Sequence, residues 1–75
     1  MVTVYSTPTC PWCQKVKKYL DSNNIEYEDV NVQEDLQGRE DMISLSNQQS
    51  VPVINANGEV IIGFDKEKLD KLFNI

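Results

Sequence analysis

Two cysteines separated by two residues are the side chains of this 75-residue chain best suited to chemistry. They stand in the segment Cys10-Pro11-Trp12-Cys13. Proline is favoured at the first position of a helix, because its missing N–H would have no partner there. A helix that starts at Pro11 places Cys10 at the N-cap, where free backbone N–H groups and the positive end of the helix dipole favour a thiolate. We therefore predict that Cys10 is a nucleophile.

Cys13 lies one helical turn after Cys10, within reach of a disulfide. Residues three apart on a helix have Cβ atoms about 5–6 Å apart, and modest adjustment brings them to the roughly 3.5–4.5 Å of a disulfide. A Cys10 thiolate would attack a substrate disulfide, and Cys13 would resolve the mixed disulfide by displacing the product. The expected activity is thiol–disulfide exchange on disulfide-containing proteins, with no metal and no organic cofactor.

Metal binding is the main alternative for this cysteine pair. A structural zinc site needs four ligands, whereas the chain has no histidine and no second pair of closely spaced cysteines. Cys10 and Cys13 could then hold zinc or an iron–sulfur cluster only between two chains. Two inert buried thiols are the remaining interpretation.

Two further residues near the cysteines each allow a structural and a functional interpretation. Trp12 is expected to be an exposed platform beside the sulfur, because the second position of a helix usually faces outward; the alternative is a core residue. Pro52 interrupts a strand-like run, where proline is tolerated at a first residue or at an edge. Taken alone, Val51-Pro52 is an ordinary trans strand start, and a cis bond that turns the Val51 backbone toward the cysteines is the alternative.

The apolar pattern around these residues predicts the order β-α-β-α-β-β-α. Strands are expected over residues 2–5, 26–32, 51–54 and 60–62. A first helix is expected from residue 11 to the Asn23-Asn24 pair, a second over residues 34–47, and a third after Asp65, which would be its N-cap. The residues 55–58 contain an Asn-Gly turn signal, which predicts a hairpin. The first two strands and the helix between them form a right-handed βαβ unit with parallel strands. This order is typical of a thioredoxin-like α/β fold.

Charge and hydropathy narrow the remaining function classes. The net charge is −5, which makes nucleic acid and anionic membranes unfavourable partners. Seven acidic side chains fall within residues 26–50 and are expected to form a solvated face. Three lysines, Lys15, Lys17 and Lys18, add positive charge close to the cysteines. No apolar stretch approaches the roughly 18–20 residues of a membrane span, and no signal peptide is recognisable, so we expect a cytoplasmic protein. We also expect it to be a monomer.

Four features follow one another along the chain: the first strand, Cys10-Pro11-Trp12-Cys13, Val51-Pro52 and Gly63-Phe64-Asp65. Together they resemble the glutaredoxin family, and in particular its small bacterial members. The resemblance covers nearly all of the chain and implies a single glutaredoxin-like domain over residues 1–75. It also implies a four-stranded mixed sheet with three helices, a nucleophilic Cys10, a resolving Cys13 and a cis Pro52.

The resemblance also implies where glutathione, as a co-substrate, would bind. Glutaredoxins hold it by a basic residue before the first cysteine, by the backbone before the cis proline and by a Gly followed by an acidic turn. These positions are Thr7, Val51 with Pro52, and Gly63, Phe64 and Asp65. Thr7 stands where a lysine is common, and Lys66 where a second polar or acidic residue is frequent. The Gly63-Phe64 pair is similar to redoxins that serve ribonucleotide reductase and take electrons from thioredoxin reductase, which implies those partners as well.

Overall fold

The computed structural model describes residues 2–74 and contains the seven elements in the predicted order. These are β1 (Val2–Ser6), α1 (Pro11–Ser22), β2 (Tyr27–Asn31), α2 (Leu36–Ser46), β3 (Val53–Ala56), β4 (Glu59–Ile62) and α3 (Lys66–Phe73). Within the described residues, none of the helices is both long enough and apolar enough to cross a membrane.

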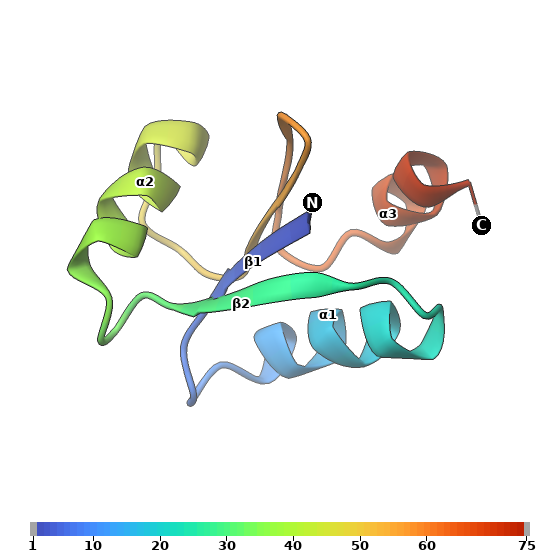
Figure 1. Cartoon of the computed structure of the whole chain (residues 1–75), viewed down its shortest axis with the longest axis horizontal. Helices are drawn as coiled ribbons and strands as arrows, with labels where there is room; N and C mark the ends of the chain where they lie inside the picture. Colours follow the sequence, from blue (N-terminus) through green and yellow to red (C-terminus); the bar gives the residue numbers. More distant parts are fainter. Residues whose placement is uncertain (1, 75) are drawn as a thin grey trace.

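The four strands form one mixed sheet in the order β2-β1-β3-β4. β1 pairs with β2 in parallel, and β3 is antiparallel to both β1 and β4. α1 makes the crossover between β1 and β2 and lies beside β2, while α2 and α3 lie toward opposite ends of the view in Figure 1. The structure thus confirms the predicted thioredoxin-like arrangement of three helices and a four-stranded mixed sheet.

Two apolar clusters cover the two faces of the sheet. Side chains alternate between the faces along a strand, so Val4 and Tyr5 of β1 point to opposite sides. Val4 packs in a cluster with Val16 of α1 and Leu69 of α3. Tyr5 packs in the other cluster with Met42 of α2. α1, which contains Cys13 and has Cys10 as its N-cap, is therefore held on one face together with α3.

β2 and α2 are both shorter than the sequence predicts. The strand expected over residues 26–32 is confined to Tyr27–Asn31, because its register partner β1 ends at Ser6 opposite Asn31. The helix expected over residues 34–47 is Leu36–Ser46. It starts there because the Asp35 side chain accepts a hydrogen bond from the Gly38 N–H at 2.9 Å, and it ends at Ser46 because the next residue, Asn47, adopts the left-handed conformation.

Gly38 of α2 lies unusually close to the sheet. A Cβ placed on this buried residue would lie 2.5 Å from Cγ1 of Val30 in β2. Real Cβ atoms essentially never lie this close to another atom, so a larger residue here would force Val30 or α2 to move. The residue that interrupts the helical pattern of the sequence is thus a contact point between the two elements.

The hairpin differs from the prediction by two residues in its first strand. The strand expected over residues 51–54 is Val53–Ala56, and the strand expected over 60–62 is Glu59–Ile62. The turn contains only Asn57 and Gly58, with φ of 54° and 96°. Positive φ at both central residues defines a type I′ turn, which closes a hairpin with two residues. The segment Val51-Pro52 consequently lies outside the sheet, ahead of β3.

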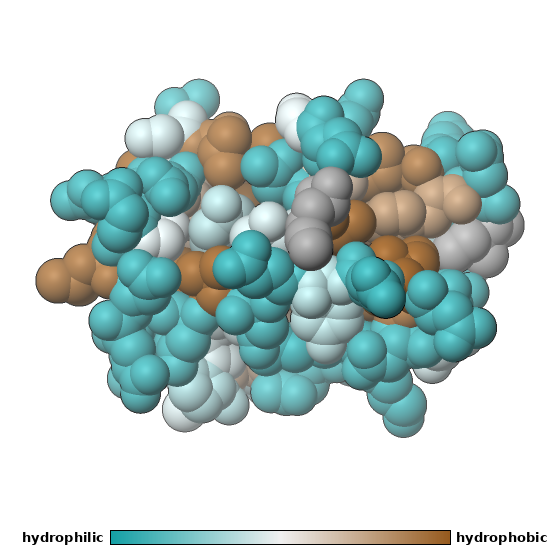
Figure 2. All heavy atoms as spheres, in the orientation of Figure 1, coloured by the Kyte–Doolittle hydropathy of each residue, from teal (hydrophilic) through white to brown (hydrophobic). Residues whose placement is uncertain are grey.

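The acidic middle of the chain is solvated, as predicted. All seven acidic residues between positions 26 and 50 are exposed. Figure 2 shows that hydrophilic side chains dominate one face of the molecule, with apolar atoms showing between them.

Candidate active site

Cys10 occupies the predicted N-cap of α1. Its backbone is extended, and its Sγ accepts a hydrogen bond from the Cys13 N–H at 3.2 Å. The Cys10 thiol in turn points to the carbonyl oxygen of Val51, 3.9 Å away. Cys10 is partly exposed, and its sulfur lies within hydrogen-bond distance of a backbone N–H of the first helical turn. This geometry suits a thiolate nucleophile.

Cys13 has a contrasting environment one turn into the helix. Its side chain has no exposed area, and both cysteines are free thiols. Burial raises the pKa of the Cys13 thiol to about 12, and a hydrogen bond with Cys10 adds to this increase. The Thr7 backbone N–H and the charge of Lys17 act in the opposite direction and lower this pKa. At neutral pH Cys13 is therefore a protonated thiol shielded from solvent.

An apolar hollow lies beside Cys10 and is lined by Trp12, Val51, Pro52, Gly63 and Phe64. Trp12 is 54% exposed, which confirms its predicted exposure and rules out the core alternative. Its ring is covered by the Lys15 ammonium, 4.3 Å from the ring centroid, in a cation–π contact. The hollow offers an extended apolar surface next to the sulfur.

The segments that form this hollow are held together by backbone contacts. The Val51-Pro52 peptide bond is cis, as the resemblance implied and as the sequence pattern alone did not. The Gly63 N–H donates to the Pro52 carbonyl oxygen at 2.8 Å. Gly63 has φ of 76°, a conformation that glycine adopts without steric cost. Phe64 contacts the ring of Tyr19 edge to face, with ring centroids 6.1 Å apart, which ties the turn to α1.

A second hollow also has Val51 in its lining. Thr7 and Val51 line it together with Arg39 and Gln49, and the remaining lining residues are Val32, Gln33 and Leu36. Arg39 donates to the Gln49 side-chain oxygen at 3.3 Å. Our sequence analysis did not select Arg39. The signal available was that it is the sole arginine of the chain, but its distance of 32 positions from Thr7 gave no reason to place them together.

Asp65, predicted as a glutathione contact, has a structural role at α3. Its carboxylate accepts from the Lys68 N–H at 3.2 Å and lies 4.0 Å from the Lys68 ammonium, which confirms it as the N-cap. Lys66 pairs with Asp70 at 2.9 Å. The structure thus gathers Cys10, Trp12 and the residues of the apolar hollow, whereas the Asp65 carboxylate is already engaged. Its part in ligand binding stays a prediction.

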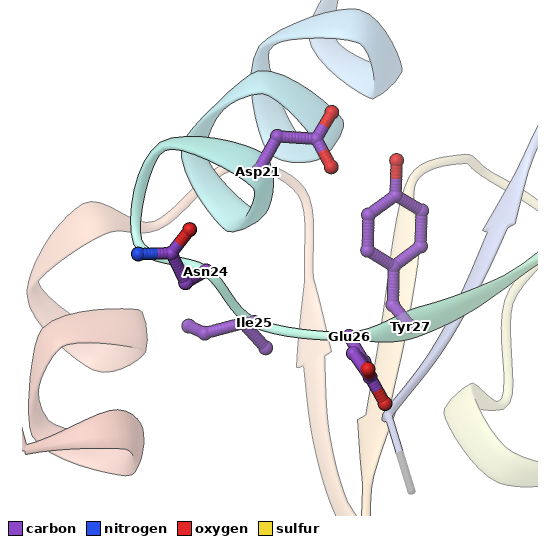
Figure 3. A pocket seen from close by; sticks show the side chains of 5 residues that line it. All are labelled: Asp21, Asn24, Ile25, Glu26 and Tyr27. Carbon is purple, nitrogen blue, oxygen red and sulfur yellow. The ribbon is translucent and has the colours of Figure 1, made fainter.

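Two other features bear on where the chemistry takes place. A hollow lined by Asp21, Tyr27 and their neighbours lies at the far end of α1, about 17 Å along the helix from Cys10 (Figure 3). It contains no cysteine. Among residues 2–74, no three His, Cys, Asp or Glu side chains are grouped so that they could hold a metal ion. A metal at Cys10 and Cys13 would therefore need ligands from a second chain, as the sequence analysis required.

Comparison with known proteins gives consistent matches over almost the whole chain. The family model described as Glutaredoxin matches residues 2–61. An uncharacterized glutaredoxin-like 8.6 kDa protein in the rubredoxin operon of Clostridium pasteurianum is 58% identical over 72 residues, 96% of each chain. The glutaredoxin-like protein NrdH of Lactococcus lactis is 35% identical over 96% of this chain and 99% of its own. The crystal structure of the thioredoxin-like protein BC3987 superimposes with a TM-score of 0.90 at 38% identity, covering 96% of this chain and 99% of that one.

Proposed function

We propose that this chain, which belongs to the glutaredoxin family, is a dithiol thiol–disulfide oxidoreductase. In this proposal Cys10 attacks the substrate disulfide, and Cys13 resolves the mixed disulfide. The observation that carries the proposal is the difference between the two thiols. Cys10 is partly exposed at a helix N-cap, and Cys13 is a buried thiol one turn away whose N–H donates to the Cys10 sulfur. An outside disulfide can therefore reach only the first sulfur, and the second sulfur can act only on what is bound to the first.

The reaction follows from these positions. The Cys10 thiolate attacks one sulfur of the substrate disulfide, forms a mixed disulfide and releases the other sulfur as a thiolate. Cys13 then attacks the Cys10 sulfur, and the bond between Cys10 and the substrate breaks. The proton of the Cys13 thiol ends on the second substrate thiol. The substrate gains two electrons, and the chain is left with a Cys10–Cys13 disulfide that a reductant must reduce.

We propose protein disulfides as the substrates. The apolar hollow beside Cys10 lies open to solvent, and its exposed Trp12 can cover the chain on either side of a substrate cysteine. The Val51 carbonyl oxygen lies 3.9 Å from the Cys10 sulfur, so a segment bound to Cys10 would run beside this loop. The relative named NrdH and the Gly63-Phe64 pair point to a ribonucleotide reductase as a partner of this kind.

For the reductant, we propose a thioredoxin reductase in preference to glutathione. Thr7 carries no cation, and Lys66, which stands where a second polar or acidic residue is frequent, is paired with Asp70. Each missing charge-assisted hydrogen bond weakens binding by about 1.5–3 kcal/mol, and by less where solvent screens it. Arg39 offers one cation in the hollow that Thr7 lines, so glutathione keeps a weaker site.

Reduction of a protein disulfide, such as that of insulin, tests this proposal with two electron sources run separately. The wild-type protein is expected to turn over faster with thioredoxin reductase and NADPH than with glutathione, glutathione reductase and NADPH. Cys10→Ser should abolish activity with both. Cys13→Ser should still form a mixed disulfide, detectable by mass, but should release protein substrates slowly. Equal turnover by the two serine variants would contradict the assigned roles.

A further inference from the structure

Lys17 differs from the other lysines of the chain in its burial. Its side chain is only 18% exposed, whereas Lys15, Lys18 and the three lysines of α3 are exposed. Lysine is rarely withdrawn from solvent unless its charge is paired. Lys17 lies four residues after Cys13 on α1, and residues at this spacing are neighbours on one face of a helix. Cys13 and Lys17 are therefore neighbours on the side of α1 that faces the sheet, where Lys17 reaches Asp29 of β2.

Two residues of the sheet fix the position of this ammonium. Nζ of Lys17 lies 2.8 Å from Oδ2 of Asp29 in β2. The other carboxylate oxygen of Asp29 accepts a hydrogen bond from the Ser6 hydroxyl at 2.7 Å. Ser6 is 1% exposed and is the one buried polar side chain among residues 2–74. Ser6, Asp29 and Lys17 thus form a chain from β1 through β2 to α1 on the face that α1 covers.

This position matters for the resolving step. Cys13 must lose its proton as it attacks, yet its burial disfavours a thiolate. Two charged or titratable groups act on Cys13 electrostatically, Cys10 from the N-cap and Lys17 from α1, while the loop after β1 contributes the Thr7 backbone N–H. On the side where the Val51 carbonyl faces Cys10, the neighbouring residues are Val51 and Pro52, and neither has a titratable side chain. Lys17 is therefore the cation available to a thiolate at Cys13.

We propose that Lys17, held by Asp29 and Ser6, is a positioning residue that stabilises the Cys13 thiolate as it resolves the mixed disulfide. The inference rests on the proposed function, because it concerns the second step of that reaction. As Cys13 attacks, the Cys13–Cys10 bond forms, the bond from Cys10 to the substrate breaks, and the departing thiolate takes up a proton. Lys17 stays protonated throughout and acts through its charge alone.

A reaction with the disulfide reagent DTNB separates the two steps. Reduced protein releases one thionitrobenzoate when Cys10 attacks and a second when Cys13 resolves, so the coloured product appears in two phases. Lys17→Gln is expected to slow the second phase by about tenfold, the effect of losing a nearby charge in a partly buried site, and to leave the first phase unchanged. Lys17→Arg should keep the second phase within a few-fold of wild type. Lys18→Gln, the same charge change on an exposed residue of the same helix, should alter neither phase.

The pH dependence and a double variant distinguish an effect of charge from one of structure. The rate of the second phase should rise with pH, and Lys17→Gln should move this rise to higher pH by about one unit. Lys17→Gln combined with Asp29→Asn should remain slow, which would exclude an uncovered Asp29 carboxylate as the cause.

Three outcomes would overturn the inference: an unchanged second phase in Lys17→Gln, equal slowing of both phases, or equal slowing in Lys18→Gln. A wild-type protein that released only one thionitrobenzoate would instead refute the proposed dithiol function itself, and with it the inference.

Discussion

Alkylation of the reduced protein is expected to label Cys10 almost exclusively, and folding is expected to protect Cys13 by a large, calculable factor. Only the thiolate reacts with iodoacetamide. With a pKa of about 12, Cys13 is ionised to a fraction of about 10⁻⁵ at pH 7. A thiol with the ordinary pKa of 9.0 is ionised to roughly 1% at that pH. Ionisation alone therefore slows the reaction of folded Cys13 about a thousandfold or more relative to the unfolded chain, and its lack of exposed area adds to this protection.

Mass spectrometry of partially alkylated protein measures this factor. Both cysteines lie in the tryptic peptide of residues 1–15, so fragmentation between Cys10 and Cys13 must locate the label. The control is the same reaction in denaturant, where the two positions should react at similar rates. Labelling of folded Cys13 at more than about a tenth of the rate of Cys10 would refute the reasoning, because burial would then not control its reactivity.

Three other perturbations follow from the structure. The unfolding free energy of the reduced protein should fall as the pH rises from about 9 to 12. Folding raises the pKa of Cys13 from 9.0, so in this range only the unfolded chain releases that proton. Chemical denaturation measures this fall, and Cys13→Ala should lessen it. Gly38→Ala should destabilise the protein by about 1–3 kcal/mol because its Cβ would overlap Val30, even though alanine favours helices by about 1 kcal/mol over glycine. Thermal unfolding measures this destabilisation, with Gln37→Ala as the control. An unchanged melting temperature would contradict the close packing. Thr7→Lys should lower KM for glutathione by about tenfold and Arg39→Gln should raise it, whereas no response to either would show that this hollow does not bind glutathione.

Much of the fold could be predicted because local signals and the overall arrangement agree. Alternating apolar residues mark the strands, Pro11 and Asp65 mark helix starts, and the Asn57-Gly58 pair marks a hairpin. The errors fell where pairing between strands sets a boundary. The hydrophobicity of Val51 predicts a strand, but the two-residue turn fixes the register so that Val53 pairs with Ile62 and Val51 lies outside it.

The candidate site was predictable where a residue acts through its neighbours in the chain. Cys10, Cys13 and the exposure of Trp12 follow from the start of a single helix. The cis form of the Val51-Pro52 bond came only from the family resemblance, because no local pattern distinguishes it from trans. Arg39 and Asp29 lay beyond prediction, since their positions depend on packing between elements that are distant in sequence.

The three lysines of α1 illustrate how tertiary structure assigns different roles to equal charges. In sequence, Lys15, Lys17 and Lys18 form one basic segment after the cysteines. In the fold, Lys15 covers the Trp12 ring at the surface, and Lys18 is exposed to solvent, which screens its charge. Only Lys17 faces the sheet, where Asp29 removes its freedom to move and low solvent access strengthens its field. Burying Cys13 protects it from outside oxidants but makes its thiolate costly, and a fixed cation at this one position lowers that cost without exposing the sulfur.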